Sequence, residues 1–298
     1  MTDFFSEVLK RSECEYKENY DLAAVSSVRI HTNAKAIVYP KSENELVNII
    51  DALTAVEIPY VVVGGISNLL FKDKVYNGVV IKTTKNNDKS VAENIISVSC
   101  GAKIGAIVRY AALMNLGGME GLSAIPGTIG GMIKQNAGAY GYEISDLLLD
   151  ALCYSPSERR FKRLAKDDMH FSYRKSVLSD SDILLISARF KLVDTPYQDV
   201  LSSVTLYREK RIQSQPITYP SLGSVFKRYR GIGAGYYVDK CGLKGYSIGG
   251  ARVSEKHAGF IINTGDATAD DYLRLIDYVK EKVYARFGIE LEEEIEII

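Results

Sequence analysis

Apolar residues in the first half of the chain recur with the spacings of strands and helices in alternation. Short apolar runs predict strands at 36–39, 60–63, 78–83 and 95–100. Between the first two runs, a capping-box pattern at 42–45 opens a helix with apolar residues at helical spacing: Leu46, Ile49, Ile50 and Leu53. A second helix is predicted from about Lys103 to Asn115, ending at a Gly-Gly pair.

The second half begins with a long apolar run at 182–193, which predicts a buried strand. Pro196 and a polar helical stretch to Arg211 then indicate a domain boundary near residue 195. The last helix is well marked, because Thr268 and Asp271 form a start signal and Gly288 a stop signal. The final segment, 289–298, is predicted as a short acidic-apolar strand, and the whole pattern indicates an α+β protein.

Length and charge narrow the classes of function. A chain of 298 residues with 46% hydrophobic content can fill more than one core. Lys+Arg and Asp+Glu both total 37, so no net field attracts nucleic acid or an anionic membrane. The N-terminus lacks a signal-peptide core and no stretch is long and apolar enough to span a membrane, which predicts a cytoplasmic protein. The four scattered cysteines and three histidines predict neither a disulfide framework nor a metal site.

Two glycine-rich segments are candidates for binding a phosphate or a cofactor. In the first, Gly64 and Gly65 follow a buried strand, and Ser67 and Asn68 add polar side chains. A tight turn explains this segment equally well, and the dinucleotide pattern G-x-G-x-x-G is absent. The second segment, 121–141, holds six glycines, whose conformational cost favours an extended cofactor lying across exposed amides over a purely structural loop.

Three further segments carry candidate chemistry, each with an ordinary alternative. Ser224 and Lys227 follow Pro-bounded turns, although a serine in a turn is usually structural. Arg174 lies among aromatic and hydroxyl side chains and suits a bidentate carboxylate, although a surface arginine is the commoner case. In the acidic stretch 292–294, strand alternation would point one carboxylate into a site, whereas a solvated tail is the default.

These segments, in this order, resemble the UDP-N-acetylenolpyruvoylglucosamine reductase (MurB) family over about residues 27–298. The resemblance rests on five motifs: GLSAIPGTIGGMIKQNAGAYG at 121–141, YRKS at 173–176, PSLGSVFKR at 220–228, GLKGYSIGGARVSEKHAGFIINTG at 242–265 and GIELEEEI at 288–295.

The resemblance implies a fold and a reaction. The expected fold is a two-subdomain FAD-binding domain of the vanillyl-alcohol-oxidase (PCMH) type, at 1–85 and 86–195, followed by an α+β substrate-binding domain at 196–298. The implied reaction is the NADPH-dependent reduction of UDP-N-acetylglucosamine enolpyruvate through bound FAD, in the synthesis of peptidoglycan precursors. A UDP-sugar substrate and a monomer are expected, with no metal and no nucleic acid.

Site residues are implied motif by motif. Ser224 matches the proton donor, and Arg174 and Glu294 match the two residues that stabilise the developing enolate. Tyr173 and Lys227 are expected to contact substrate, and His257 is expected to be structural. The residues expected to bind FAD are Gly64, Gly65, Ser67, Asn68, Gly127, Thr128, Gly130, Gly131, Asn136, Ala137 and Gly138.

The chain departs from the family pattern at a few positions. Ile66 replaces the third glycine of the usual G-G-G-S-N, which bears on loop conformation and FAD affinity. His31-Thr32 replaces a Gly-Gly pair, and Tyr229 and Glu293 replace prolines. Two alternatives stay open: a flavin oxidoreductase with another substrate, which retention of all three catalytic matches disfavours, and a flavin-binding regulator without catalysis.

Overall fold

The computed structural model describes residues 2–298 and divides into two compact units. The described part of the first unit comprises 2–18, 36–65 and 78–209, and the second unit comprises 19–35, 66–77 and 210–298. The chain therefore enters each unit more than once. In the residues described, no helix is long and apolar enough to cross a membrane.

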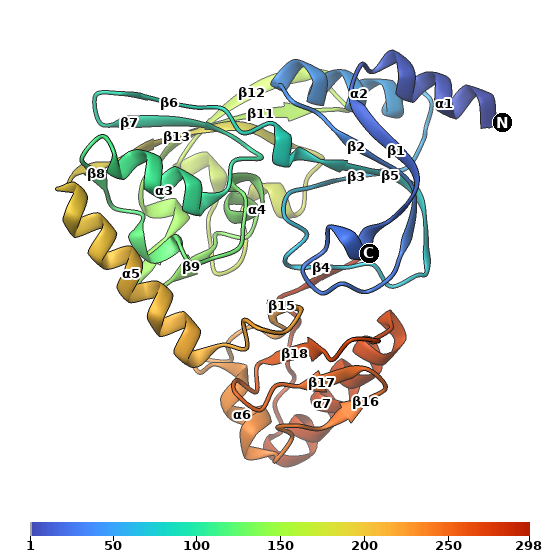
Figure 1. The fold of residues 1–298 in the computed structure, drawn as a ribbon, viewed down its shortest axis with the longest axis vertical. Helices are drawn as coiled ribbons and strands as arrows, with labels where there is room; N and C mark the ends of the chain where they lie inside the picture. The colour runs from blue at the N-terminus through green and yellow to red at the C-terminus, as the bar shows by residue number, and fades with distance from the viewer. Residues whose placement is uncertain (1) are drawn as a thin grey trace. The chain divides into compact units, whose positions relative to one another are not determined.

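The sheet nearest the N-terminus has four strands in the order β1-β2-β5-β3 (Figure 1). Its strands are β1 (Glu15–Asp21), β2 (Asn33–Tyr39), β3 (Tyr60–Val63) and β5 (Val75–Lys82). Helices α1 (Thr2–Arg11) and α2 (Glu43–Ala55) accompany it. The Ser42 hydroxyl accepts from the Glu45 amide and caps α2, whose buried stripe packs with Val38, Val79 and Ile81. The predicted helix is confirmed, but only half of the predicted capping box forms, because the Glu45 carboxylate accepts from the Lys41 amide at 2.8 Å and not from the Ser42 amide.

The rest of the first unit is built on a five-stranded sheet in the order β12-β11-β13-β7-β6, whose neighbouring strands pair antiparallel. Its strands are β6 (Lys89–Ala92), β7 (Ile95–Ser99), β11 (Leu148–Ser155), β12 (Arg160–Ala165) and β13 (Leu184–Lys191). Helices α3 (Ile104–Ala112) and α4 (Ile129–Lys134) and most of α5 (Tyr197–Ser214) belong to this part. Two short strand pairs complete it: β8 (Leu116–Gly117) with β14 (Val193–Asp194), and β9 (Gly138–Ala139) with β10 (Tyr142–Glu143).

The second unit has its own four-stranded sheet in the order β15-β18-β17-β16. Its strands are β15 (Ser221–Ser224), β16 (Ser247–Ile248), β17 (Ala251–Val253) and β18 (Phe260–Asn263), with helices α6 (Ala234–Lys240) and α7 (Ala269–Phe287). Thr268 and Asp271 form a capping box at the start of α7, and Gly288 ends it with φ +66, so both predicted signals are confirmed. A parallel pair, β4 (Leu69–Leu70) with β19 (Glu296–Ile297), completes the unit.

The predicted strand at 289–298 is only partly present. Regular strand is confined to Glu296–Ile297, because the partner strand β4 is itself only two residues long. Before it, the chain makes one isolated bridge, between Phe226 and Glu293. The strand alternation that we expected for 292–294 therefore does not apply as a regular pattern, and tertiary hydrogen bonds set the path of this segment instead.

Candidate active site

The two glycine segments predicted to bind cofactor meet in the first unit. A Cβ atom placed on Gly64 would lie 1.9 Å from Thr128 Oγ1, so only glycine allows this approach. Thr128 is the N-cap residue of α4, and its backbone pairs with Lys103. A Cβ atom on Gly131, by contrast, would have no neighbour nearer than 3.9 Å. Packing within the protein thus explains Gly64, whereas it leaves Gly131 unexplained.

Ile66 keeps the backbone conformation for which glycine is usual. Its φ is +50, in the left-handed region, and its side chain is only 3% exposed. That conformation costs a residue other than glycine about 1–2 kcal/mol, whereas burying an isoleucine side chain stabilises by about 1.5–3 kcal/mol. Burial therefore offsets the strain, and replacing the usual glycine does not force the loop out of the left-handed conformation.

Asn136 connects the second glycine segment to the turn that carries Arg174. Its side-chain amide donates to Glu143 Oε2 at 3.1 Å and to the Ser172 carbonyl at 3.2 Å. Among the described residues, none donates to Asn136 Oδ1, although Asn136 is only 3% exposed. Buried amide oxygens normally have a donor, so a ligand with an N–H or O–H group fits this position.

Arg174 occupies a strained turn. Ser172 and Lys175 exchange two backbone hydrogen bonds of 3.1 Å around it, and Arg174 has φ +56. The hydroxyls of Ser176 and Ser179 both donate to the carbonyl of Lys134, at the end of α4. The guanidinium lies 5.0 Å from the centre of the Tyr173 ring, which holds it by a cation–π contact. Strain of this kind is concentrated at functional sites.

In the second unit, Ser224 ends β15 at an irregularity. Gly223 has φ +81, and the register between β15 and β18 shifts between Ser221 and Ser224. The Ser224 hydroxyl and the His257 ring both lie within about 3.3 Å of the position that a Cβ on Gly259 would take. His257 Nδ1 accepts from the Gly259 amide at 3.1 Å, and burial lowers its pKa, which favours a neutral ring.

Backbone hydrogen bonds bring Glu294 to the residue next to Ser224. The Glu294 amide donates to the Val225 carbonyl at 2.7 Å, and the Lys227 amide donates to the Glu292 carbonyl at 2.9 Å. On the other side, Asn68 Nδ2 donates to the Glu294 carbonyl at 3.0 Å, and the Asn68 carbonyl accepts from the Glu296 amide at 2.8 Å. Ser224 and Glu294, which are predicted catalytic residues, are thus held together within one unit.

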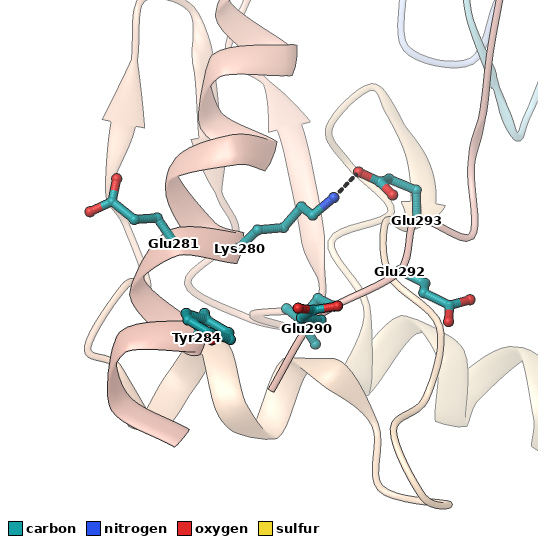
Figure 2. Close-up of a pocket in the computed structure, with 7 residues that line it drawn as sticks. Lys280, Glu281, Tyr284, Glu290, Glu292 and Glu293 are labelled. Carbon is teal, nitrogen blue, oxygen red and sulfur yellow. Dashed lines mark hydrogen bonds and ion pairs between the residues drawn. The ribbon is translucent and has the colours of Figure 1, made fainter. Parts of the chain in front are cut away.

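The pocket in Figure 2 lies beside the segment that leads to Glu294, but its lining does not suit the predicted reaction. Its volume is about 470 Å³, and four glutamates line it, together with Lys280, Tyr284 and Leu291. Glu293 pairs with Lys280 at 2.8 Å (Figure 2). Among the described residues that line it, none belongs to the predicted site. An excess of carboxylates would repel an anionic sugar nucleotide.

Two predicted ligands have protein partners in this structure. Lys227 Nζ lies 3.1 Å from Glu292 Oε2, a solvent-exposed pair, and the Asn68 side chain donates to the Glu294 carbonyl.

Sequence reasoning did not single out Lys82, whose buried ammonium donates to the Gly64 carbonyl at 2.9 Å. A lysine ending the apolar run 79–81 was the available signal. Within residues 5–298, no group of three or more metal-ligating side chains occurs.

Comparison with known proteins identifies the family. The model of the UDP-N-acetylenolpyruvoylglucosamine reductase C-terminal domain matches residues 215–298, and the FAD binding domain model matches 34–157. A UDP-N-acetylenolpyruvoylglucosamine reductase of Caldicellulosiruptor bescii is 41% identical over 99% of this chain and 94% of its own length. This chain belongs to the UDP-N-acetylenolpyruvoylglucosamine reductase family.

Further similar proteins support this family assignment and the fold. The reductase of Clostridioides difficile is 37% identical over 91% of this chain and 90% of its own length. The crystal structure of the Thermus caldophilus reductase (MurB) matches with a TM-score of 0.79 at 30% identity, over 96% of this chain and 98% of that chain. Physcomitrella patens BBE-like 1, at 14% identity and a TM-score of 0.51 over 63% of this chain and 44% of its own, shares the fold of the FAD domain. The predicted family and the predicted α+β fold with an FAD-binding domain are confirmed.

Proposed function

We propose that this FAD-dependent reductase uses NADPH to reduce UDP-N-acetylglucosamine enolpyruvate to UDP-N-acetylmuramate. The observation that carries the proposal is the pairing of Glu294 with Val225, which holds two of the three matched catalytic residues together. The third, Arg174, is held in a strained turn, as expected for a functional side chain. The related proteins of Caldicellulosiruptor bescii and Clostridioides difficile are named as reductases of the enolpyruvyl sugar nucleotide.

The residues of this chain fit the cofactor. Two features suit an extended dinucleotide lying on backbone: Gly131, whose missing side chain the packing does not explain, and the buried Asn136 Oδ1, which has no donor among the described residues. We assign FAD to Gly64, Gly65, Ser67, Gly127, Thr128, Gly130, Gly131, Asn136, Ala137 and Gly138, and also to Asn68 through its backbone. When bound, FAD supplies a hydride, taken from NADPH, to the methylene carbon of the enolpyruvyl group.

The protein groups manage charge and the proton. Addition of hydride to the methylene carbon leaves negative charge on the enolate carboxylate, which the Arg174 guanidinium stabilises with Glu294 completing the site. The Ser224 hydroxyl donates its proton to the neighbouring carbon and is reprotonated from solvent. One NADPH and one proton are consumed for each enolpyruvyl double bond reduced. Tyr173 and Lys227 are assigned to the substrate.

The test follows flavin absorbance in anaerobic solution. The purified protein with FAD should bleach when NADPH is added and should recover its oxidised spectrum when UDP-N-acetylglucosamine enolpyruvate follows. Bleaching without recovery would reject this substrate and favour another flavin oxidoreductase reaction, whereas FAD binding without bleaching would favour a binding protein. We further propose a cytoplasmic monomer, for which size-exclusion chromatography with light scattering should give the mass of one chain.

A further inference from the structure

Lys82 places a positive charge inside the first unit without a carboxylate to balance it. The residue ends β5, where it pairs in parallel register with Val63 at the end of β3. It is 7% exposed, and its ammonium donates to the Gly64 carbonyl at 2.9 Å. Among residues 5–298, no acidic side chain forms an ion pair with Lys82 or shifts its pKa. One neutral acceptor uses only one of its three N–H groups.

Among the described residues, the charge that shifts the pKa of Lys82 is a second cation, Lys103. Burial, reinforced by the charge of Lys103, lowers the pKa of Lys82 to about 8. Lys103 lies on the segment whose backbone pairs with Thr128, and Thr128 is the residue against which Gly64 packs. The Lys82 ammonium and the backbone of Lys103 therefore both lie at the point where the two glycine segments meet.

A structural role alone does not explain this arrangement. A buried ammonium with one carbonyl partner destabilises the fold, and an apolar side chain of similar length would avoid that cost. An anion beside it would reverse the balance, since charge-assisted bonds to phosphate are among the strongest in proteins. Unpaired buried charges with shifted pKa values are typical of functional sites.

We infer that Lys82 is the counter-cation of the FAD pyrophosphate, fixed beside the phosphate-binding loop by the Gly64 carbonyl. This assignment rests on the FAD binding of the proposed function, and not on its sugar substrate. It gives the first glycine segment a charge that backbone amides alone do not supply, in a protein with no net charge to attract anions.

The main test compares Lys82→Met with Lys85→Met in flavin-free protein. Lys85, three residues further on, is an exposed lysine paired with Glu15, so its change removes the same charge outside the loop. Fluorescence titration should show FAD binding weakened roughly tenfold to a hundredfold in Lys82→Met and nearly unchanged in Lys85→Met. Riboflavin has no phosphate and should bind both variants and the unchanged protein alike.

Stability and pH give readouts that do not depend on activity. The folded-state pKa of Lys82 lies below its ordinary value of 10.5, so the protonated side chain destabilises the folded protein when FAD is absent. Lys82→Met should therefore raise the Tm of the flavin-free protein at pH 7 while weakening FAD. Because bound FAD favours the charged lysine, FAD affinity of the unchanged protein should fall as pH rises through about 8, a fall that Lys82→Met should lack.

Two results would overturn the inference: unchanged FAD affinity in Lys82→Met, or an equal loss of FAD and riboflavin binding. If Lys82→Met does not fold, Lys82→Gln, which keeps a donor but no charge, and the pH titration of the unchanged protein still decide. Normal FAD binding by the unchanged protein with no turnover of the enolpyruvyl sugar would reject the proposed function alone.

Discussion

The Gly64–Thr128 contact and the Val225–Glu294 pairing reach their geometry by opposite means. At Gly64 the sequence removes a side chain, so that two loops can approach each other closely. At Glu294 the sequence adds hydrogen bonds, from Val225 on one side and Asn68 on the other, to fix a side chain that must act. A binding surface for an extended cofactor needs open backbone, whereas a proton-transfer site needs side chains held at defined positions.

The largest effect is expected from removing the proton donor of the second region. Ser224→Ala should leave NADPH-driven bleaching of the flavin intact and slow reoxidation by the enolpyruvyl sugar by about 10²–10⁴-fold. Stopped-flow absorbance measures both half-reactions separately. Reoxidation at a near-normal rate would remove Ser224 from the mechanism, and loss of bleaching would show that the change reaches the cofactor.

The first region should be most sensitive at Gly64. An alanine there would place its Cβ 1.9 Å from Thr128 Oγ1, so we expect Gly64→Ala to lose FAD and to unfold at a clearly lower temperature. Gly131→Ala, whose Cβ would have no neighbour nearer than 3.9 Å at a helical position in α4, is the matched control for stability alone and should change the Tm of the flavin-free protein little.

A double variant tests the cause of that loss. Adding Thr128→Ala to Gly64→Ala removes the clashing hydroxyl, so FAD content and Tm should recover in part. Purely additive losses in the double variant would show that the Gly64 effect has another origin than this contact.

Several elements could be predicted from sequence because their determinants are local. The caps of α2 and α7 lie within three residues of the amides that they bond, and the apolar runs of β3 and β7 are continuous. The sites differ in this respect. Gly64 and Thr128 are far apart in the chain, as are Asn68 and Glu294, and no local pattern encodes such contacts. Motif resemblance supplied the residue types, and only the fold supplied their partners.

A smaller effect is expected from the hydrogen bond between the Asn68 side chain and Glu294. Asn68→Asp keeps the shape but replaces the donor by an oxygen that faces the Glu294 carbonyl. Loss of such a bond costs about 1–3 kcal/mol, so substrate-driven reoxidation should slow by roughly tenfold while FAD affinity changes less. Asn87→Asp, which loses an exposed bond to the Thr84 carbonyl, is the control. Weakened FAD with normal reoxidation would instead assign the Asn68 side chain to the cofactor.

The smallest effect should come from Glu293, where the family usually has proline. The bridge at this point uses the carbonyl of Glu292 and the amide of Glu294, so the amide of Glu293 donates neither bond. Glu293→Pro then removes only the partly exposed pair with Lys280, which contributes about 0–1 kcal/mol. Proline also lowers the conformational entropy of the unfolded chain, which stabilises the folded protein and offsets that loss. The Tm and the turnover should therefore stay close to those of the unchanged protein. Glu294→Pro, one residue further, removes the donor to Val225 together with the carboxylate, and should clearly slow reoxidation by substrate. Thermal unfolding and stopped-flow measurements on this pair locate the proline-tolerant position to a single residue, and similar damage from both changes would mean that the Val225–Glu294 bond does not fix the site.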